Sequence, residues 1–104
     1  MVNEYKGHFG YTKLSIVVNS PDEIGIYYMG ILNSNGSLGV LNVGRAMGEQ
    51  VTIKSRLLSH INSGEWPDIT HFGFRVCSIP QEVEDLEKEE TVRLGIPKYN
   101  KRIG

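Results

Sequence analysis

Two apolar segments joined by a polar turn stand out in the first half of the chain. Residues 24–32 ("IGIYYMGIL") are almost continuously apolar, and a second apolar segment, 38–44 ("LGVLNVG"), follows the polar stretch "NSNGS". Short apolar runs bounded by turn residues are typical of buried strands. The Asn35-Gly36 step readily adopts the positive φ angles of a tight hairpin turn. The pattern therefore predicts an antiparallel β-hairpin over residues 24–44.

The first 23 residues are expected to form an arm ahead of this hairpin. Residues 1–13 are polar and contain glycine, which predicts irregular structure. The segment "KLSIVV", Lys13–Val18, has the β-branched residues of a strand, and Pro21 ends it because proline has no backbone N–H. We therefore divide the chain into an arm of residues 1–23, with room for one extra strand, and a main domain of residues 24–104.

After residue 50 the apolar residues recur at helical spacing. A helix is expected to begin at residues 50–52 and to end at Gly64, because glycine often closes a helix in the left-handed conformation. The residues that would form its buried face are Ile53, Leu57, Leu58 and Ile61.

A third strand and a second helix complete the pattern. Residues 69–79 ("ITHFGFRVCSI") are interpreted as the strand. Pro80 can open the helix, because the first N–H of a helix has no partner within it. The helix is expected to reach about Leu94, with Val83 and Leu86 facing the core. The order β-β-α-β-α predicts an α+β fold, with a small, mainly antiparallel three-stranded sheet flanked by helices.

The composition is that of an ordinary globular domain. The chain has 104 residues, 39% of them hydrophobic and 22% charged, which favours one domain with one core. No apolar run approaches the about 20 residues needed to cross a bilayer, and a signal-peptide pattern is absent. Cys77 is the single cysteine and cannot form an internal disulfide. These features predict a cytoplasmic protein that does not enter a membrane.

The charge is unevenly distributed although its sum is only −1. Six of the twelve acidic residues lie in residues 82–90, and the rest of the chain carries ten basic and six acidic residues. A mildly basic body with one acidic segment is compatible with binding to phosphates. It is equally compatible with a near-neutral protein that has a solvated acidic helix.

Arg56 and His60 are four residues apart in the first predicted helix, so they share one of its faces. A guanidinium can bind a phosphate through two hydrogen bonds. An imidazole can position the phosphate or carry a proton. The alternative is a surface arginine beside a half-buried histidine.

Five features in order along the chain resemble the GIY-YIG nuclease family, over residues 24–103. They are "GIY" at 25–27, "NVGRA" at 42–46, Arg56 with His60, Glu87, and "PKYN" at 97–100. The resemblance implies a GIY-YIG nuclease domain that hydrolyses phosphodiester bonds with one divalent metal, Mg²⁺ or Mn²⁺.

The resemblance also implies the roles of the catalytic residues. Tyr27 would help to deprotonate the attacking water, while His60 and Asn100 would orient the reacting groups. Tyr28 would point to the opposite face of the sheet, because neighbouring strand residues alternate. Asn42 stands where the family has the tyrosine of its YIG segment. It can bind a phosphate oxygen or a water, but it cannot act as a phenol.

The remaining site residues would bind the metal or the substrate. Glu87 is the expected metal ligand, with Glu89 or Glu90 as alternatives, and one carboxylate with several waters suits Mg²⁺. The residues expected to contact the phosphate backbone are Arg45, Arg56, Lys98, Lys101 and Arg102.

The predicted function is that of a metal-dependent endonuclease acting on DNA, or on RNA. Asn42 supports a second interpretation, a nucleic-acid-binding module that has lost efficient cleavage. A third interpretation is a purely structural or partner-binding domain. A chain of 104 residues is expected to have no room for a separate DNA-recognition domain. Specificity for particular nucleic acids would then come from a homodimer, a partner protein or the N-terminal arm.

Overall fold

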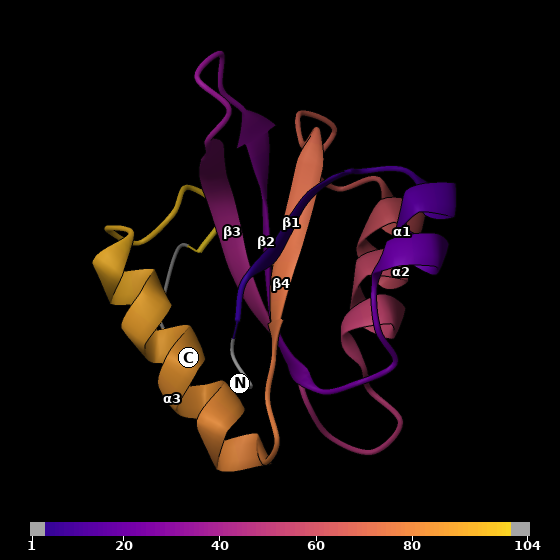
Figure 1. Ribbon diagram of the computed structural model, residues 1–104, viewed down its shortest axis with the longest axis vertical. Helices are drawn as coiled ribbons and strands as arrows, with labels where there is room; N and C mark the ends of the chain where they lie inside the picture. Colours follow the sequence, from indigo (N-terminus) through magenta and orange to yellow (C-terminus); the bar gives the residue numbers. More distant parts are fainter. Residues whose placement is uncertain (1–3, 101–104) are drawn as a thin grey trace.

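A computed structural model of the chain describes residues 4–100 and contains a four-stranded antiparallel sheet and three helices (Figure 1). The strands lie in the order β1-β4-β2-β3. The predicted α+β class is confirmed, but the predicted number of strands, three, is one too few. The elements are β1 (Lys6–Gly10), α1 (Lys13–Asn19), β2 (Gly25–Leu32), β3 (Leu38–Ala46), α2 (Ile53–Ser63), β4 (His71–Val76) and α3 (Pro80–Arg93).

The helices cover both faces of the sheet and create two separate cores (Figure 1). Helices α1 and α2 lie on one face, and α3 lies on the other. The core beneath α1 and α2 contains Tyr27 and Leu57, whereas the core beneath α3 contains Tyr28 and Val83. Tyr27 and Tyr28 therefore point to opposite faces, as predicted. Cys77 is buried in the core beneath α3.

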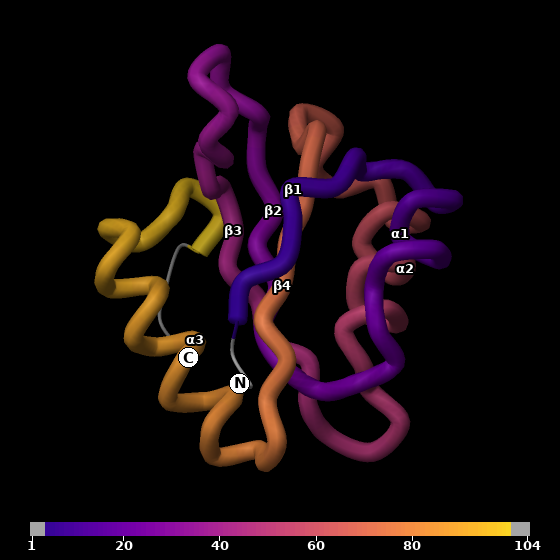
Figure 2. The backbone as a smooth tube through the Cα atoms, viewed as in Figure 1, coloured from indigo at the N-terminus to yellow at the C-terminus, as the bar shows by residue number. Residues whose placement is uncertain are grey.

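The hairpin of β2 and β3 is the predicted one. Tyr27 lies opposite Gly44 and Tyr28 opposite Val43, and a β-bulge interrupts the register after Met29. The tube in Figure 2 shows the chain returning to β3 after α3, where the backbone N–H of Tyr99 donates to the carbonyl of Leu41 at 2.7 Å. This return brings the C-terminal segment to the edge of the sheet.

The predicted strand at Lys13–Val18 is wrong, because this segment is the helix α1. A strand would place Leu14, Ile16 and Val18 on one face. Ile16 is fully buried, but Leu14 and Val18 are 74% and 70% exposed. The side chain of Thr12 accepts a hydrogen bond from the N–H of Ser15 and caps the helix.

The extra strand of the arm lies earlier, within the segment predicted to be irregular. β1 pairs with β4, and Phe9 lies opposite Phe72, on whose ring it packs at a centroid distance of 5.5 Å. Gly7 allows the two strands to approach, because a Cβ atom there would lie 2.9 Å from Cα of Gly73. Long-range pairing rather than local propensity thus decides the structure of these residues.

The two longer helices begin and end near the predicted residues. Thr52 and Ser55 form a capping box at the start of α2, and Gly64 closes it with φ 65°. Pro80 opens α3, which ends at Arg93. None of the helices in the described part of the chain is long and apolar enough to span a membrane.

Candidate active site

A chain of hydrogen bonds links Tyr27, His60 and Glu65. Tyr27 lies on β2 and is 1% exposed, and its hydroxyl is 2.8 Å from Nε2 of His60 on α2. Nδ1 of the same imidazole is 2.8 Å from Oε1 of Glu65, just beyond the end of α2. A carboxylate only accepts hydrogen bonds, so Nδ1 carries a proton, and in a neutral imidazole Nε2 then accepts from the Tyr27 hydroxyl. The arrangement can move a proton from tyrosine to histidine.

The environment of Tyr27 acts on its acidity in opposing directions. Burial is the largest effect, and the net result is that the pKa of the hydroxyl lies above its ordinary value. The Arg56 guanidinium lowers this pKa through its charge and through hydrogen bonding, and the charges of Glu65 and Glu87 raise it. Side chains from α2, from the loop after it and from α3 therefore all act on the same hydroxyl.

Gly44 gives the Tyr27 ring its position. A Cβ atom at residue 44 would lie 2.2 Å from Cζ and 2.3 Å from the hydroxyl oxygen of Tyr27. Contacts this short do not occur between real atoms, so the ring occupies the space that the glycine leaves. The "GIY" and "NVG" segments are thus one structural unit across two strands.

Asn42 and Asn100 meet at the free edge of β3. The Asn100 side chain accepts from the N–H of Val43 at 2.7 Å and donates to its carbonyl at 2.8 Å, so it pairs with the strand as another strand would. Nδ2 of Asn42 donates to Oδ1 of Asn100 at 3.3 Å. Asn42 is 7% exposed, and its Oδ1 has no hydrogen-bond partner within residues 4–100. A donor such as a water would satisfy this buried oxygen.

Stacked rings support the imidazole from the side of the C-terminal segment. The Trp66 ring stacks on His60 at 4.9 Å and on Tyr99 at 5.0 Å. The Tyr99 hydroxyl donates to the carboxylate of Asp68 at 2.7 Å. The stacked rings of His60, Trp66 and Tyr99 fix the orientation of the imidazole. They also connect it to the C-terminal segment, which carries Asn100.

Of the predicted metal ligands, Glu87 is the one whose charge acts on the Tyr27 hydroxyl, although α3 covers the opposite face of the sheet. It lies on α3 and is 9% exposed, and its carboxylate has no hydrogen bond or ion pair with another described residue. Glu90 is instead bound by Arg93 and by the Tyr28 hydroxyl. Glu89 is exposed.

The described residues offer separate oxygen donors, from α3 and from β3, for the expected hydrated Mg²⁺. Within residues 4–100, no group of three or more His, Cys, Asp or Glu side chains could hold a metal ion. The free carboxylate of Glu87 and the unsatisfied oxygen of Asn42 are the hard oxygen donors that Mg²⁺ or its waters prefer.

The predicted phosphate-binding residues are only partly brought together. Arg56 is exposed, and no described carboxylate forms an ion pair with it. Arg45 is exposed and lies opposite Ile26, so its side chain leaves β3 on the α3 side, away from Tyr27. Lys98 is exposed and places Nζ 5.3 Å from the centroid of the Tyr99 ring. The other two, Lys101 and Arg102, lie outside the described residues.

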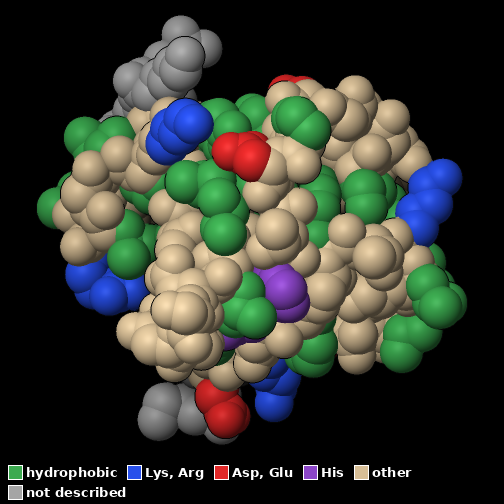
Figure 3. Space-filling model, turned by 90° about the horizontal axis from the view of Figure 1, so that it is seen from above, with side chains coloured by type: hydrophobic (Ala, Val, Ile, Leu, Met, Phe, Trp, Pro, Cys, Tyr) green, Lys and Arg blue, Asp and Glu red, His purple; other side chains and the backbone are tan. Residues whose placement is uncertain are grey.

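Basic side chains do not gather into one patch on the face seen in Figure 3. There, lysine and arginine side chains (blue) lie apart, with hydrophobic side chains (green) between them. The positive charges that could attract a phosphate backbone are therefore spread over this face and not concentrated at one place.

Glu65 was not among the residues predicted from the sequence. It lies five residues after His60, beyond the glycine that ends α2, and only the reversal of the chain at Gly64 brings its carboxylate to Nδ1. An acidic residue directly after such a glycine is the one signal that could have pointed to it.

Comparison of the chain with protein-family models, with curated proteins and with solved structures found no match.

Proposed function

We propose that the chain is a metal-dependent endonuclease that hydrolyses phosphodiester bonds in DNA, in the manner of GIY-YIG nucleases. The observation that carries the proposal is the hydrogen-bonded chain of Tyr27, His60 and Glu65. The Tyr27 hydroxyl lies 2.8 Å from an imidazole that a carboxylate orients, which places it to pass its proton to His60.

The reaction begins with proton transfers within this chain of residues. Tyr27 passes its hydroxyl proton to Nε2 of His60, and the carboxylate of Glu65 stabilises the resulting imidazolium. The phenolate takes a proton from the attacking water. The water oxygen forms a bond to phosphorus while the bond from phosphorus to the leaving ester oxygen breaks. The leaving oxygen takes a proton from solvent, and His60 releases one.

Arg56 controls both the phosphate and access to the hydroxyl. Tyr27 is 1% exposed, so water reaches its hydroxyl only when a covering side chain moves. Arg56 is exposed, acts on the Tyr27 hydroxyl and has no ion pair with a described carboxylate. A bound phosphate would draw this guanidinium into a bidentate contact and open the way to Tyr27. Lys98 would add attraction that does not depend on sequence.

Glu87 would hold the divalent metal, Mg²⁺ or Mn²⁺, largely through one carboxylate. When bound, the metal neutralises charge that develops on the phosphate and its leaving oxygen. The contribution of this chain is a carboxylate kept free of ion pairs within the described residues.

The second candidate function is binding without efficient cleavage. It is favoured by Asn42, which occupies the buried edge position where the resemblance implies a tyrosine. Loss of one acid–base participant commonly costs about 10²- to 10⁴-fold in rate. Tyr27, His60 and Glu65 remain in contact, which favours the enzyme.

Cleavage of supercoiled plasmid and of labelled single strands, with Mg²⁺ or Mn²⁺, tests the proposal. The Glu87→Ala variant is compared with Glu89→Ala, which removes an exposed acid from the same helix. The proposal expects cleavage that EDTA and Glu87→Ala abolish and that Glu89→Ala leaves unchanged. Binding that weakens steeply with salt, without cleavage, would identify a binding module instead. Equal activity of both variants would exclude Glu87 as the ligand.

A further inference from the structure

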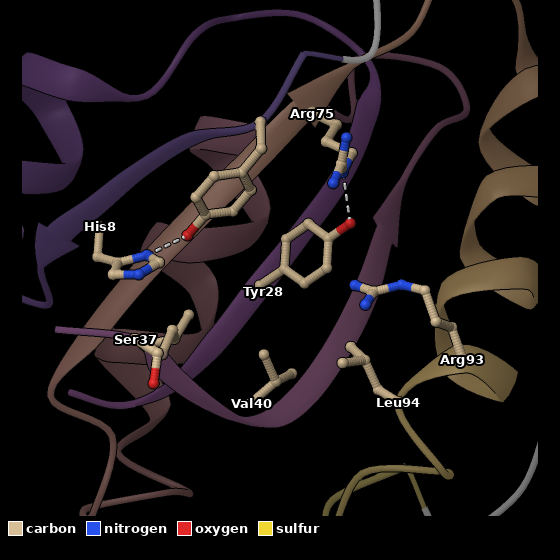
Figure 4. A pocket seen from close by; sticks show the side chains of 9 residues that line it. His8, Tyr28, Ser37, Val40, Arg75, Arg93 and Leu94 are labelled. Carbon is tan, nitrogen blue, oxygen red and sulfur yellow. Dashed lines mark hydrogen bonds between the residues drawn. The ribbon is translucent and has the colours of Figure 1, made fainter. Parts of the chain in front are cut away.

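The polar groups around the pocket on the α3 face of the sheet bind one another (Figure 4). The dashed line from Arg75 to the Tyr28 hydroxyl in Figure 4 is a hydrogen bond of 2.7 Å. Nε of Arg93 donates to Glu90 at 2.7 Å, and the Tyr28 hydroxyl donates to the same carboxylate at 2.6 Å. These charges therefore hold β2, β4 and α3 together.

Helix α1, on the opposite face of the sheet, exposes an apolar stripe. Leu14, Val17 and Val18 are 74%, 50% and 70% exposed. Their spacing of three and four residues places them on one side of the helix, opposite Ile16, which is fully buried. Single exposed hydrophobic side chains are normal on a protein surface, but three on one side of a seven-residue helix are typical of an interaction site.

The apolar stripe of α1 lies on the outside of the domain. The inner side of α1 packs on α2 and on β1, and Figures 1 and 2 show α1 at the outer edge of its side of the sheet. Hydrophobic side chains (green) lie at the right-hand edge of Figure 3, the side on which Figure 1 places α1. The stripe is therefore accessible to another molecule.

Opposite charges lie at the two ends of this stripe. Lys13 is the first residue of α1 and is exposed, and Glu23, also exposed, comes four residues after the helix ends. The carbonyl of Glu23 accepts from the N–H of Ile53 at 2.9 Å, which places this acid where α2 begins. Within residues 4–100, neither Lys13 nor Glu23 forms an ion pair, whereas the neighbouring Asp22 lies 3.8 Å from Lys54.

We propose that two copies of this chain associate through α1, with the two helices antiparallel about a twofold axis. A twofold contact places the same surface of each copy against the other. The apolar stripe then covers its counterpart, and Lys13 of each copy meets the acidic end of the other, at Glu23. A different protein would need an apolar stripe with charges in the matching order, whereas a second copy supplies both.

The contact is small, so the dimer is expected to form only at high protein concentration. Stable interfaces bury about 800 Å² on each partner, and a stripe of three side chains falls short of that area. Binding of both copies to one nucleic acid would raise their local concentration and favour the dimer. Two candidate sites would then act on one nucleic acid. This last consequence rests on the proposed function, but the dimer itself does not.

Sedimentation of the full chain over a series of concentrations, without metal or nucleic acid, tests the dimer. We expect the mean mass to rise from that of one chain towards that of two. Val18→Ser should weaken association about tenfold or more, because each dimer loses two buried valine side chains. Val92→Ser is the matched control and should leave association unchanged, because Val92 is a 65% exposed valine on α3.

Charge reversal tests the antiparallel arrangement. Lys13→Glu and Glu23→Lys should each weaken association, because like charges then meet twice in every dimer. The double variant restores opposite charges at both contacts, so it should associate as well as the unaltered chain.

Three results would overturn the proposal. One is a chain that stays monomeric up to roughly 1 mM, which would leave the stripe to a different partner. The second is equal association by Val18→Ser and Val92→Ser, each shown to be folded by its thermal unfolding. The third is a double charge-reversal variant that associates no better than either single variant. Sedimentation involves no cleavage, so each result stands whether or not the chain is a nuclease.

Discussion

The ring of Tyr27 lies over Gly44 on the neighbouring strand, where a Cβ atom would fall 2.2 Å from Cζ of the tyrosine. The two residues face each other in the register of β2 and β3. The hydroxyl at the far end of the ring reaches His60. The distance from tyrosine to histidine therefore depends on the absence of a side chain at residue 44.

Substituting Gly44 by alanine should displace the Tyr27 ring and break its hydrogen bond to His60. Overpacking of a filled core costs about 1–3 kcal/mol, so the variant should also unfold more easily. Chemical denaturation and the plasmid assay measure both effects. Gly10→Ala is the matched control, because no atom lies within 4 Å of a Cβ placed there. If Gly44→Ala were as stable and active as Gly10→Ala, the ring would not depend on this glycine.

Glu65→Gln should slow cleavage by about 10²-fold while the fold is retained, because the neutral amide stabilises the imidazolium of His60 less well. Glu65 is a positioning residue, so kcat should fall with little change in KM. Glu49→Gln, an exposed acid outside the site, should leave both constants unchanged. A fall confined to KM would show that Glu65 acts on substrate binding instead.

Stability should decline in alkali between about pH 10 and pH 12. Burial raises the pKa of Tyr11 to about 12 and that of Tyr5 to about 12. In the unfolded chain, a tyrosine hydroxyl titrates near pH 10. Above pH 10 the unfolded state loses protons that the folded state retains, so the free energy of unfolding falls. Urea denaturation from pH 8 to pH 12 measures it. Tyr11→Phe should make the decline shallower, and a flat profile would contradict the prediction.

Asn42→Tyr should increase the rate of cleavage about 10- to 10²-fold if the missing phenol limits the reaction. The substitution leaves no described donor without its acceptor, since Oδ1 of Asn42 has no partner within the described residues. It does remove the 3.3 Å contact with Asn100, so the unfolding midpoint is measured alongside the rate. An unchanged rate in a folded variant would show that Asn42 is not what limits activity.

Local signals allowed the hairpin and the two longer helices to be predicted. The Asn35-Gly36 turn, the glycine that ends α2 and the proline that opens α3 each fix a boundary by their own backbone preferences. Lys13–Val18 carries no such signal, because β-branched residues suit a strand. The helix that forms there is capped by Thr12, and Ile16 is its one buried residue.

The arrangement of the candidate site could be predicted where a motif names its residues, but not where distant segments meet. Tyr27, His60 and Asn100 were found through the resemblance and lie in one region of the structure. Glu65 was missed, since a chain reversal brings it to His60. The placement of Arg45 on the α3 side follows from strand register, which no single motif specifies.

The measurement that tests the central claim most directly is a double-mutant cycle on plasmid cleavage with Tyr27→Phe and His60→Ala. If the two side chains act as one proton-transfer unit, each single variant should lose about as much kcat as the double variant. Independent, additive losses, or cleavage unchanged in both single variants, would contradict the account.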